Sequence, residues 1–366
     1  MTISSVLPKA IENLDSFVRE KIVCEHKKII TKIRRNVENV LNSYKSLDGE
    51  IPKSGLKNSL FIRRGQKKKL AWVKLRVCDE QILIYVRIPK TKGAVKRVEQ
   101  QVVLYGTDLP PGVYAYGKPI ITKGSEEAES NRVEIEHEQT ISSKFNSERI
   151  VSMDRVTKRK KPYKLKAVRS PWFKEGTLEN LFEKGKLQFE DALRIFIDIM
   201  TGVQKFHKQN YAHLDLKPEN VLIGKEAEKL RAALTDFGRV SELNAVYDGA
   251  VGSLIYTPPE MFNSQWHPNF SMDIWSAGII GYELFKGKDK NLFRFKEDVN
   301  FETEDLRDSS RFRSIRRQWQ LLQQKIVKDL DETPINTLLK KMLSTVPEDR
   351  PTAQEVLDRL ADCQKE

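Results

Sequence analysis

Apolar side chains recur at helical spacing in residues 9–44, close to the N-terminus. Side chains three or four residues apart share one face of a helix, and here lysine and arginine residues crowd the other positions. The pattern predicts an amphipathic helix that packs on its own protein. A dimer interface or a helix that docks on a partner is the alternative. The apolar positions are Ile11, Leu14, Val18, Ile22, Ile29, Ile33, Val37 and Leu41.

The next part of the chain favours β-strands. Short apolar runs at residues 60–62 and 71–77 flank a basic turn at residues 63–69, and further runs occupy residues 82–88 and 98–105. Runs of this length between polar or glycine-containing turns are typical of strands. We therefore expect a basic hairpin followed by further strands.

From residue 130 onward the pattern becomes mainly helical. A helix is expected at residues 130–144, strands at 150–153 and 163–169, and a long amphipathic helix at 189–209. The first of these helices would bury Ile135, Ile141 and Phe145. The long helix would bury Leu193, Phe196, Ile197, Met200, Val203 and Phe206.

Composition agrees with a soluble globular protein, since 31% of the residues are charged and 39% are hydrophobic. The net charge of +13 favours acidic partners such as phosphate compounds or nucleic acid, although a solvated basic surface gives the same count. Cys24, Cys78 and Cys363 are scattered, which indicates a reducing compartment rather than a disulfide framework. The sequence contains no run long and apolar enough to span a bilayer, so we expect a cytoplasmic protein.

Residues suited to phosphoryl transfer gather after the long helix. The sequence H-L-D-L-K-P-E-N-V-L-I begins at His213 and contains Asp215, Lys217 and Asn220, and a T-D-F-G sequence downstream adds Asp236. One carboxylate can orient a hydroxyl group, and a lysine can meet phosphate. An amide with a second carboxylate can hold Mg²⁺.

In this order and spacing, these residues resemble the catalytic core of eukaryotic-type protein kinases. The sequence G-S-L-I-Y-T-P-P-E, which ends at Glu260, is similar to the end of their activation segment, with Pro258 in place of alanine. Asp273 in D-I-W-S-A-G and Arg350 in V-P-E-D-R-P match two later motifs. The resemblance implies that Asp273 accepts hydrogen bonds from the catalytic-loop backbone and that Arg350 pairs with Glu260.

The same resemblance implies an α+β, two-lobed protein kinase-like fold. The small N-terminal lobe would hold an antiparallel sheet, the large C-terminal lobe would be mainly helical, and an N-terminal helical extension would precede both. We expect the extension at residues 1–80, the N-lobe at 81–169 and the C-lobe at 170–366.

The nucleotide site that the resemblance implies begins with adenine. Ser170 takes the gatekeeper position, backbone groups near Trp172 and Phe173 would bind adenine, and Leu222 would lie beneath it. Of the glycine-rich loop only Gly93 is kept, and Val98 would contact the nucleotide from the strand that follows. Positive charge on Lys92, Lys96 and Arg97 would partly replace the missing glycines.

The sequence Y-A-Y-G-K, which ends at Lys118, resembles the V-A-I-K strand of kinases. The resemblance makes Lys118 the phosphate-binding lysine and Glu138 its partner, with Glu136 and Glu134 as alternatives. Tyr116 then stands where a small alanine usually admits adenine. A one-residue bulge would place Ala115 there instead.

The activity implied is transfer of the γ-phosphate of ATP to a protein substrate. Asp215 would orient the substrate hydroxyl, Asn220 and Asp236 would hold Mg²⁺, and Lys217 would meet the transferring phosphoryl group. Lysine two residues after the catalytic aspartate is typical of serine/threonine kinases in this family.

Leu214 follows His213 where many of these kinases carry arginine. That arginine is neutralised by a phosphate on the activation segment, and here there is no such charge to compensate. We predict that activity does not depend on phosphorylation of the activation segment. The hydroxyl groups concerned are those of Ser241, Tyr247, Ser253 and Thr257.

Other functions remain open at this point. A pseudokinase that acts as a binding module would explain the reduced glycine loop and Tyr116. A small-molecule kinase of the aminoglycoside or choline type shares H-x-D-x-x-x-x-N but generally lacks the Pro-Pro-Glu ending and its Arg350 partner. The basic N-terminal region would suit an acidic partner in either case, and a secreted effector that acts inside a host cell is the alternative to a resident cytoplasmic protein.

Overall fold

The computed structural model describes residues 9, 10, 12, 13, 35, 39, 56–63, 70–78, 81–87, 96–106, 110–119, 126–158, 161–243, 254–262, 267–287, 317, 321 and 323–363. The chain forms two compact units. One consists of Met1–Gln139 and Met153–Lys174, and the other of Thr140–Ser152 and Glu175–Glu366.

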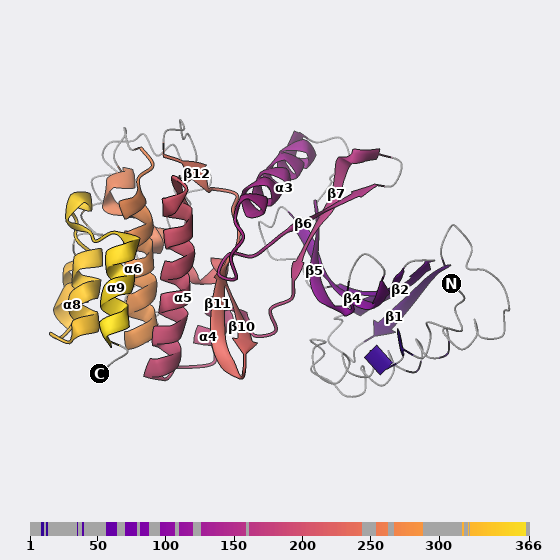
Figure 1. Cartoon of the computed structure of the whole chain (residues 1–366), viewed down its shortest axis with the longest axis horizontal. Coiled ribbons are helices and arrows are strands. Elements are labelled where there is room, and N and C mark those ends of the chain that lie inside the picture. The colour runs from indigo at the N-terminus through magenta and orange to yellow at the C-terminus, as the bar shows by residue number, and fades with distance from the viewer. Residues whose placement is uncertain are drawn as a thin grey trace. The chain divides into compact units, whose positions relative to one another are not determined.

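The first unit is built around a seven-stranded sheet in the order β1-β2-β3-β4-β5-β7-β6 (Figure 1). All neighbouring strands are antiparallel. Helix α3 (Glu126–Lys144) buries Ile135 together with Val168 of β7. The strands are β1 (Leu56–Arg63), β2 (Leu70–Cys78), β3 (Gln81–Arg87), β4 (Lys96–Gly106), β5 (Gly112–Pro119), β6 (Asp154–Lys158) and β7 (Lys161–Pro171).

The predicted basic hairpin is present as β1 and β2, and it continues the sheet, because β2 also pairs with β3. The boundary expected after residue 80 thus falls between two neighbouring strands of one sheet, and the division into an extension and an N-lobe stays a prediction. Most of the predicted N-terminal helix lies outside the described residues. Within it, Ala10 is buried and Asn13 donates a hydrogen bond to the carbonyl of Leu104 on β4 at 3.0 Å.

The strand expected at residues 150–153 is wrong, because β6 begins only at Asp154. The N–H of Val151 donates to the carbonyl of Leu234 at 2.9 Å, and the N–H of Leu234 donates to the carbonyl of Arg149 at 2.9 Å. These bonds attach the segment to β11 of the second unit. Arg149 also contacts Asp198 of α5 at 2.8 Å, which holds the same segment.

The second unit is mainly helical, and its helices α5, α6, α8 and α9 pack side by side (Figure 1). The helices are α4 (Leu178–Phe182), α5 (Phe189–Lys208), α6 (Phe270–Lys286), α8 (Pro334–Met342) and α9 (Ala353–Cys363). The short 3₁₀ turns are η1 (Pro218–Asn220), η2 (Leu254–Tyr256), η3 (Pro259–Phe262) and η4 (Pro347–Asp349). The strands are β8 (Gly176–Thr177), β9 (Tyr211–Ala212), β10 (Val221–Glu226), β11 (Lys229–Leu234) and β12 (Ser241–Glu242).

Helix α6 is buried on nearly all sides, which explains its almost continuous apolar sequence. A Cβ atom at Gly281 would lie 2.6 Å from Leu339 Cδ2 and 2.9 Å from the ring of Phe196. Glycine therefore allows α5 and α8 to approach α6 closely. The antiparallel sheet and the helical unit confirm the predicted α+β class. None of the helices that the structure describes has the length and apolar character needed to cross a bilayer.

Candidate active site

Three of the predicted catalytic side chains meet in the loop between β9 and β10. Lys217 Nζ donates to Asp215 Oδ2 at 2.8 Å, and Asn220 Nδ2 donates to the same oxygen at 3.0 Å. Asn220 Nδ2 also donates to the backbone carbonyl of Asp215 at 2.8 Å. The Asp215 side chain is 10% exposed, so solvent screens these charge-assisted bonds only weakly.

Asp236 lies two residues after the end of β11 and has a φ of +66°, in the left-handed region. Aspartate tolerates this conformation better than most residues, and such backbone is found preferentially at functional sites. The N–H of Thr235 donates to the carbonyl of Asn220 at 3.0 Å. This bond joins the end of β11 to the loop that carries Asp215, so the polar residues of both segments are held by one framework.

The oxygen atoms of Asn220 and Asp236 suit Mg²⁺, which prefers hard oxygen ligands. The part of the chain that the structure describes contains no group of three or more His, Cys, Asp or Glu side chains ready to hold a metal ion. Magnesium is commonly bound by one or two protein ligands together with water and substrate phosphates. The residues present therefore fit a metal ion that binds together with a nucleotide.

The side chain of Asp273 on α6 binds the backbone of the catalytic loop, as predicted. Its carboxylate accepts the N–H of His213 at 2.8 Å and the N–H of Leu214 at 2.9 Å. His207 Nε2 lies 2.9 Å from Asp273 Oδ2. Burial raises the pKa of Asp273, but His207 and the N–H of His213 outweigh it and hold this pKa below its ordinary value. Leu214, with a φ of +61°, keeps its strained backbone because its own N–H group and that of His213 are both fixed by Asp273.

His213 is fully buried against two aromatic rings, which also contact each other. The ring of Phe206 on α5 lies 5.7 Å from it and the ring of Phe237 lies 6.1 Å from it, both nearly perpendicular. Burial lowers the pKa of His213, although the negative charges of Asp273, Asp215 and Asp236 oppose this. The imidazole is therefore a neutral packing element beneath the catalytic loop at ordinary pH.

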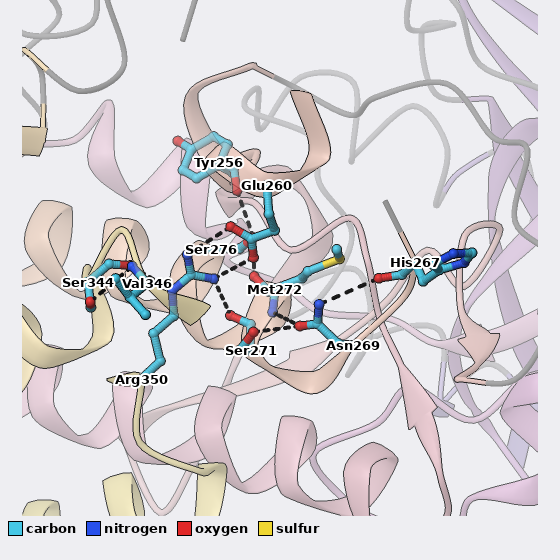
Figure 2. A network of polar contacts seen from close by, with 10 residues as sticks. All are labelled: Tyr256, Glu260, His267, Asn269, Ser271, Met272, Ser276, Ser344, Val346 and Arg350. Carbon is cyan, nitrogen blue, oxygen red and sulfur yellow. Dashed lines mark hydrogen bonds and ion pairs between the residues drawn. The ribbon is translucent and has the colours of Figure 1, made fainter. Parts of the chain in front are cut away.

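The predicted pair of Glu260 and Arg350 is confirmed and lies at the centre of a polar network (Figure 2). Arg350 Nη1 donates to Glu260 Oε1 at 2.6 Å, and Nη2 donates to Oε2 at 2.8 Å. Arg350 also donates to the carbonyls of Ser344 and Ser271, at 2.8 Å and 3.0 Å. The end of the activation segment is thereby fixed to α6 and to the chain before α9.

Leu214 takes part in an apolar cluster rather than a charged one. Ala212, Met261 and Met272 are buried with it, and Leu243 of the activation segment packs against them. Two of the four hydroxyl groups considered for phosphorylation are described: Ser241 lies in β12, and Thr257 is buried. Tyr247 and Ser253 lie outside the described residues.

Lys118, the predicted phosphate-binding lysine, lies beside an acidic residue of the neighbouring strand. Its Nζ donates to Glu99 Oε2 at 2.6 Å and lies 5.1 Å from the centre of the Tyr116 ring. Glu99 is only 2% exposed and stands directly opposite Tyr116 in the pairing of β4 with β5. Lys118 thus balances a buried carboxylate on the face of the sheet that Tyr116 occupies.

Val98 on β4 and Glu138 on α3 are two further residues of the predicted nucleotide site. Val98 stands opposite Gly117, so it belongs to the other face of the sheet, and the structure does not bring it together with Lys118. Glu138 is 1% exposed on α3, and its pairing with Lys118 stays a prediction. Gly93 lies outside the described residues.

Two of the predicted adenine contacts, Trp172 and Phe173, lie where β7 leaves the sheet. Ser170 pairs with Ala115, with no irregularity between β5 and β7. The N–H of Trp172 donates to the carbonyl of Val113 at 3.3 Å, so this group is already engaged. Phe173 follows and is partly buried, and Leu222 is a half-buried residue of β10 in the second unit, between two fully buried neighbours.

Sequence reasoning missed three polar residues that join α3 to the activation segment. Tyr211 of β9 donates a hydrogen bond to Glu242 of β12 and accepts one from Lys144, the last residue of α3. Their spacing in the sequence carries no local pattern. The missed Glu99 had a weak signal, since it is an acidic residue within a strand that also buries Val102 and Val103.

Comparison with known proteins decides the family. A model of the protein kinase domain family matches residues 115–360, which is more than half of the chain. The chain belongs to the protein kinase domain family. The match to this kinase family begins at Ala115 of β5 and runs to Leu360 of α9, so it includes the catalytic loop and the Glu260–Arg350 pair.

Curated relatives carry names of serine/threonine kinases. The chain is 38% identical over 112 residues to serine/threonine protein kinase OSK3 of Oryza sativa, a match that covers 29% of this chain and 21% of the relative. It is 30% identical over 183 residues to the probable serine/threonine-protein kinase HSL1 of Saccharomyces cerevisiae, covering 44% and 12%. It is 37% identical over 123 residues to SNF1-related protein kinase catalytic subunit alpha KIN12 of Arabidopsis thaliana, covering 32% and 23%. The chain thus spans less than a quarter of the length of these relatives.

Proposed function

We propose that this chain is an ATP-dependent protein kinase that phosphorylates serine or threonine hydroxyl groups. One observation carries the proposal: Lys217 and Asn220 both donate to the Asp215 carboxylate, in a loop whose backbone is held by Asp273. The names of the curated relatives support the same activity. Lys217 supports the choice of serine or threonine over tyrosine.

Asp215 would accept a hydrogen bond from the substrate hydroxyl and aim its oxygen at the γ-phosphate of ATP. Lys217, already beside Asp215, would neutralise charge on the phosphoryl group during transfer, and Asn220 would keep Asp215 in position. Asn220 and Asp236 would hold Mg²⁺, which supplies charge neutralisation on the phosphate oxygens when bound. Positioning and electrostatics account for most of the rate in such transfers.

A protein substrate is favoured over a small molecule. The segment that ends at Glu260 is fixed by two hydrogen bonds to Arg350, and Tyr256 in the same segment donates to Glu283 of α6 at 2.9 Å. Such a fixed segment offers an extended platform, which a small-molecule kinase does not need. The predicted acidic partner, dimer interface and cytoplasmic location stay predictions, and the first two concern N-terminal residues that are largely outside the described part of the chain.

The test uses the full chain with radiolabelled ATP, Mg²⁺ and a generic basic protein, followed by analysis of the labelled amino acid. Label is expected on phosphoserine or phosphothreonine, and Asp215→Asn should reduce incorporation at least about 100-fold. Glu348→Gln, at an exposed position before α9, is the matched control and should retain full incorporation. Nucleotide binding without incorporation would instead favour a pseudokinase, and incorporation that survives Asp215→Asn would contradict the proposed role of Asp215.

A further inference from the structure

Strand β12, near the start of the activation segment, is held to β9 by few backbone contacts. The pairing comprises two residues on each strand, Ser241–Glu242 and Tyr211–Ala212. One further hydrogen bond joins the N–H of Leu243 to the carbonyl of Asn210 at 3.3 Å. A two-stranded ladder this short is only marginally stable by itself. Side chains must therefore help to keep the activation segment beside the strand that leads into the catalytic loop.

The hydroxyl group of Tyr211 joins β12 to the end of α3. It donates a hydrogen bond to the carboxylate of Glu242 and accepts one from Nζ of Lys144, the last residue of α3. A phenolic hydroxyl group can donate and accept at the same time, so Tyr211 serves both charged groups. All three residues belong to the second unit. We call Tyr211, Glu242 and Lys144 the Tyr211 cluster.

The direct attraction between Lys144 and Glu242 contributes little to this cluster. Their charged atoms are 4.0 Å apart, and the two side chains are 43% and 58% exposed. Solvent screens such an exposed ion pair, and pairs of this kind add little to stability. Tyr211, by contrast, is only 7% exposed. The main connection between α3 and β12 in the cluster is therefore the tyrosine side chain rather than the ion pair.

The ring of Tyr211 is held by its neighbours. Phe145 packs edge-on against it with ring centres 5.8 Å apart, and Phe145 in turn lies 4.4 Å from the ring of Phe206 on α5. Nζ of Lys144 lies 4.8 Å from the centre of the Tyr211 ring, which adds a cation–π contact. The hydrogen bond to Tyr211 raises the pKa of Lys144, so the amine stays charged at neutral pH. A side chain fixed in this way can hold its partners in one position.

We propose that Tyr211 is a positioning residue for phosphoryl transfer. It precedes Asp215 by four residues, and its partner Glu242 follows Asp236 by six. The hydrogen bond from Tyr211 to Glu242 therefore joins the segment of the catalytic carboxylate to the segment of the expected metal ligand. It limits the movement of Asp215 relative to Asp236, and small displacements at a catalytic site reduce the rate steeply. This assignment rests on the proposed kinase activity.

The test begins with Tyr211→Phe in the full chain, which removes only the hydroxyl group and keeps the ring against Phe145. This variant should lower kcat about 10-fold and keep KM for ATP within about twofold of the parent value. Tyr282→Phe is the matched control, since Tyr282 on α6 is also buried and donates to a carboxylate, that of Asp329, at 3.0 Å. Both variants should lower Tm, but only Tyr211→Phe should change kcat.

A double-mutant cycle identifies the group through which Tyr211 acts. Glu242→Ala should lower kcat about as much as Tyr211→Phe, and the double variant should lose no more than either single variant. Glu242→Gln keeps an acceptor oxygen and should retain more activity than Glu242→Ala. Lys144→Met should likewise cause no further loss in the Tyr211→Phe background, and Lys205→Met, at an exposed position of α5, is its control and should retain full activity.

Amide hydrogen exchange provides a readout that needs no catalysis. The N–H of Leu243 should exchange about 10-fold faster in Tyr211→Phe than in the parent, because β12 opens locally more often. Tyr282→Phe should leave the exchange of Leu243 unchanged. Parent-like exchange in Tyr211→Phe would contradict the claim that its hydroxyl group holds β12.

Three kinetic results would overturn the assignment: an unchanged kcat in Tyr211→Phe, an equal loss of kcat in Tyr282→Phe, or additive losses for Tyr211→Phe and Glu242→Ala. A parent protein that transfers no phosphate would refute the proposed catalysis instead. The exchange of Leu243 would then still decide whether Tyr211 holds the activation segment, so the two failures are distinguishable.

Discussion

Arg350 donates two parallel hydrogen bonds to the carboxylate of Glu260, although 90 residues separate them in the sequence. The Arg350 side chain is completely buried, and its guanidinium carbon lies 4.9 Å from the centre of the Trp275 ring. Both hydrogen bonds are charge-assisted, and the planar guanidinium matches the carboxylate geometry. A lysine cannot reproduce this arrangement.

Arg350→Lys should therefore lower the free energy of unfolding by about 3 kcal/mol or more, because it breaks a buried pair and leaves Glu260 poorly compensated. Urea unfolding of the full chain measures this change. A double-mutant cycle with Glu260→Gln should give a coupling energy of at least about 1 kcal/mol. Additive effects of the two substitutions would show that the contact contributes nothing specific.

Asp273→Asn should impair catalysis more than nucleotide binding. The asparagine side chain offers one acceptor oxygen, whereas the carboxylate accepts the N–H groups of both His213 and Leu214. Misplacement of Asp215 should reduce kcat about 100-fold, with little change in KM for ATP. Steady-state kinetics test this, and an unchanged kcat in a folded variant would contradict the proposed role of Asp273 in holding the loop.

Stability should fall as the pH is lowered below about 6.5. Because the pKa of buried His213 lies below its ordinary value of 6.5, the unfolded chain binds a proton in this range that the folded chain does not. Folding is therefore disfavoured progressively as the pH falls from 6.5 toward the lowered pKa, by up to about 1.4 kcal/mol per pH unit. Thermal melting from pH 7.5 to 5.5 measures the effect.

His213→Phe provides the matched comparison, since a phenyl ring can pack against Phe206 and Phe237 without titrating. The pH dependence of Tm between pH 6.5 and 5.5 should be shallower in this variant. Parallel pH profiles for the parent and the variant would assign the acid sensitivity to other groups.

Activity should be independent of phosphorylation of the activation segment. Leu214 is buried in one apolar cluster with Met261 and Met272, so the described side chains of this cluster hold no positive charge that a phosphate would neutralise. Phosphatase-treated protein and Ser241→Ala should both keep kcat within about twofold of the untreated parent, an effect small on the scale of one hydrogen bond. Leu214→Arg should lower Tm, because it buries an uncompensated charge among apolar side chains. Loss of activity on phosphatase treatment would contradict this account.

The second unit could be predicted from the sequence largely because its decisive features are local. The periodicity of α5, the loop from His213 to Asn220 and the start of α6 each lie within a short stretch, and the structure confirms all three helical or loop assignments. The Glu260–Arg350 pair spans a long distance, but each member lies in its own recognisable motif.

The register of β5 could not be predicted in the same way. Side chains alternate with a period of two, so an error of one residue exchanges the faces of the strand. The sequence Y-A-Y-G-K allows either Ala115 or Tyr116 beside the gatekeeper, and only the pairing of Ala115 with Ser170 decides between them. The strand prediction for residues 150–153 failed for a related reason. Val151 forms its hydrogen bond with Leu234, which is far away in the sequence.

The hairpin of β1 and β2 has a practical consequence for shortened versions of this protein. Strand β3 is paired on both sides, with β2 and with β4. A fragment that starts after residue 80 would leave a row of unsatisfied N–H and C=O groups along β3, and such edges promote association between chains. Strands β1 and β2 therefore cover the edge of β3, and their removal should be expected to yield aggregates rather than a minimal kinase.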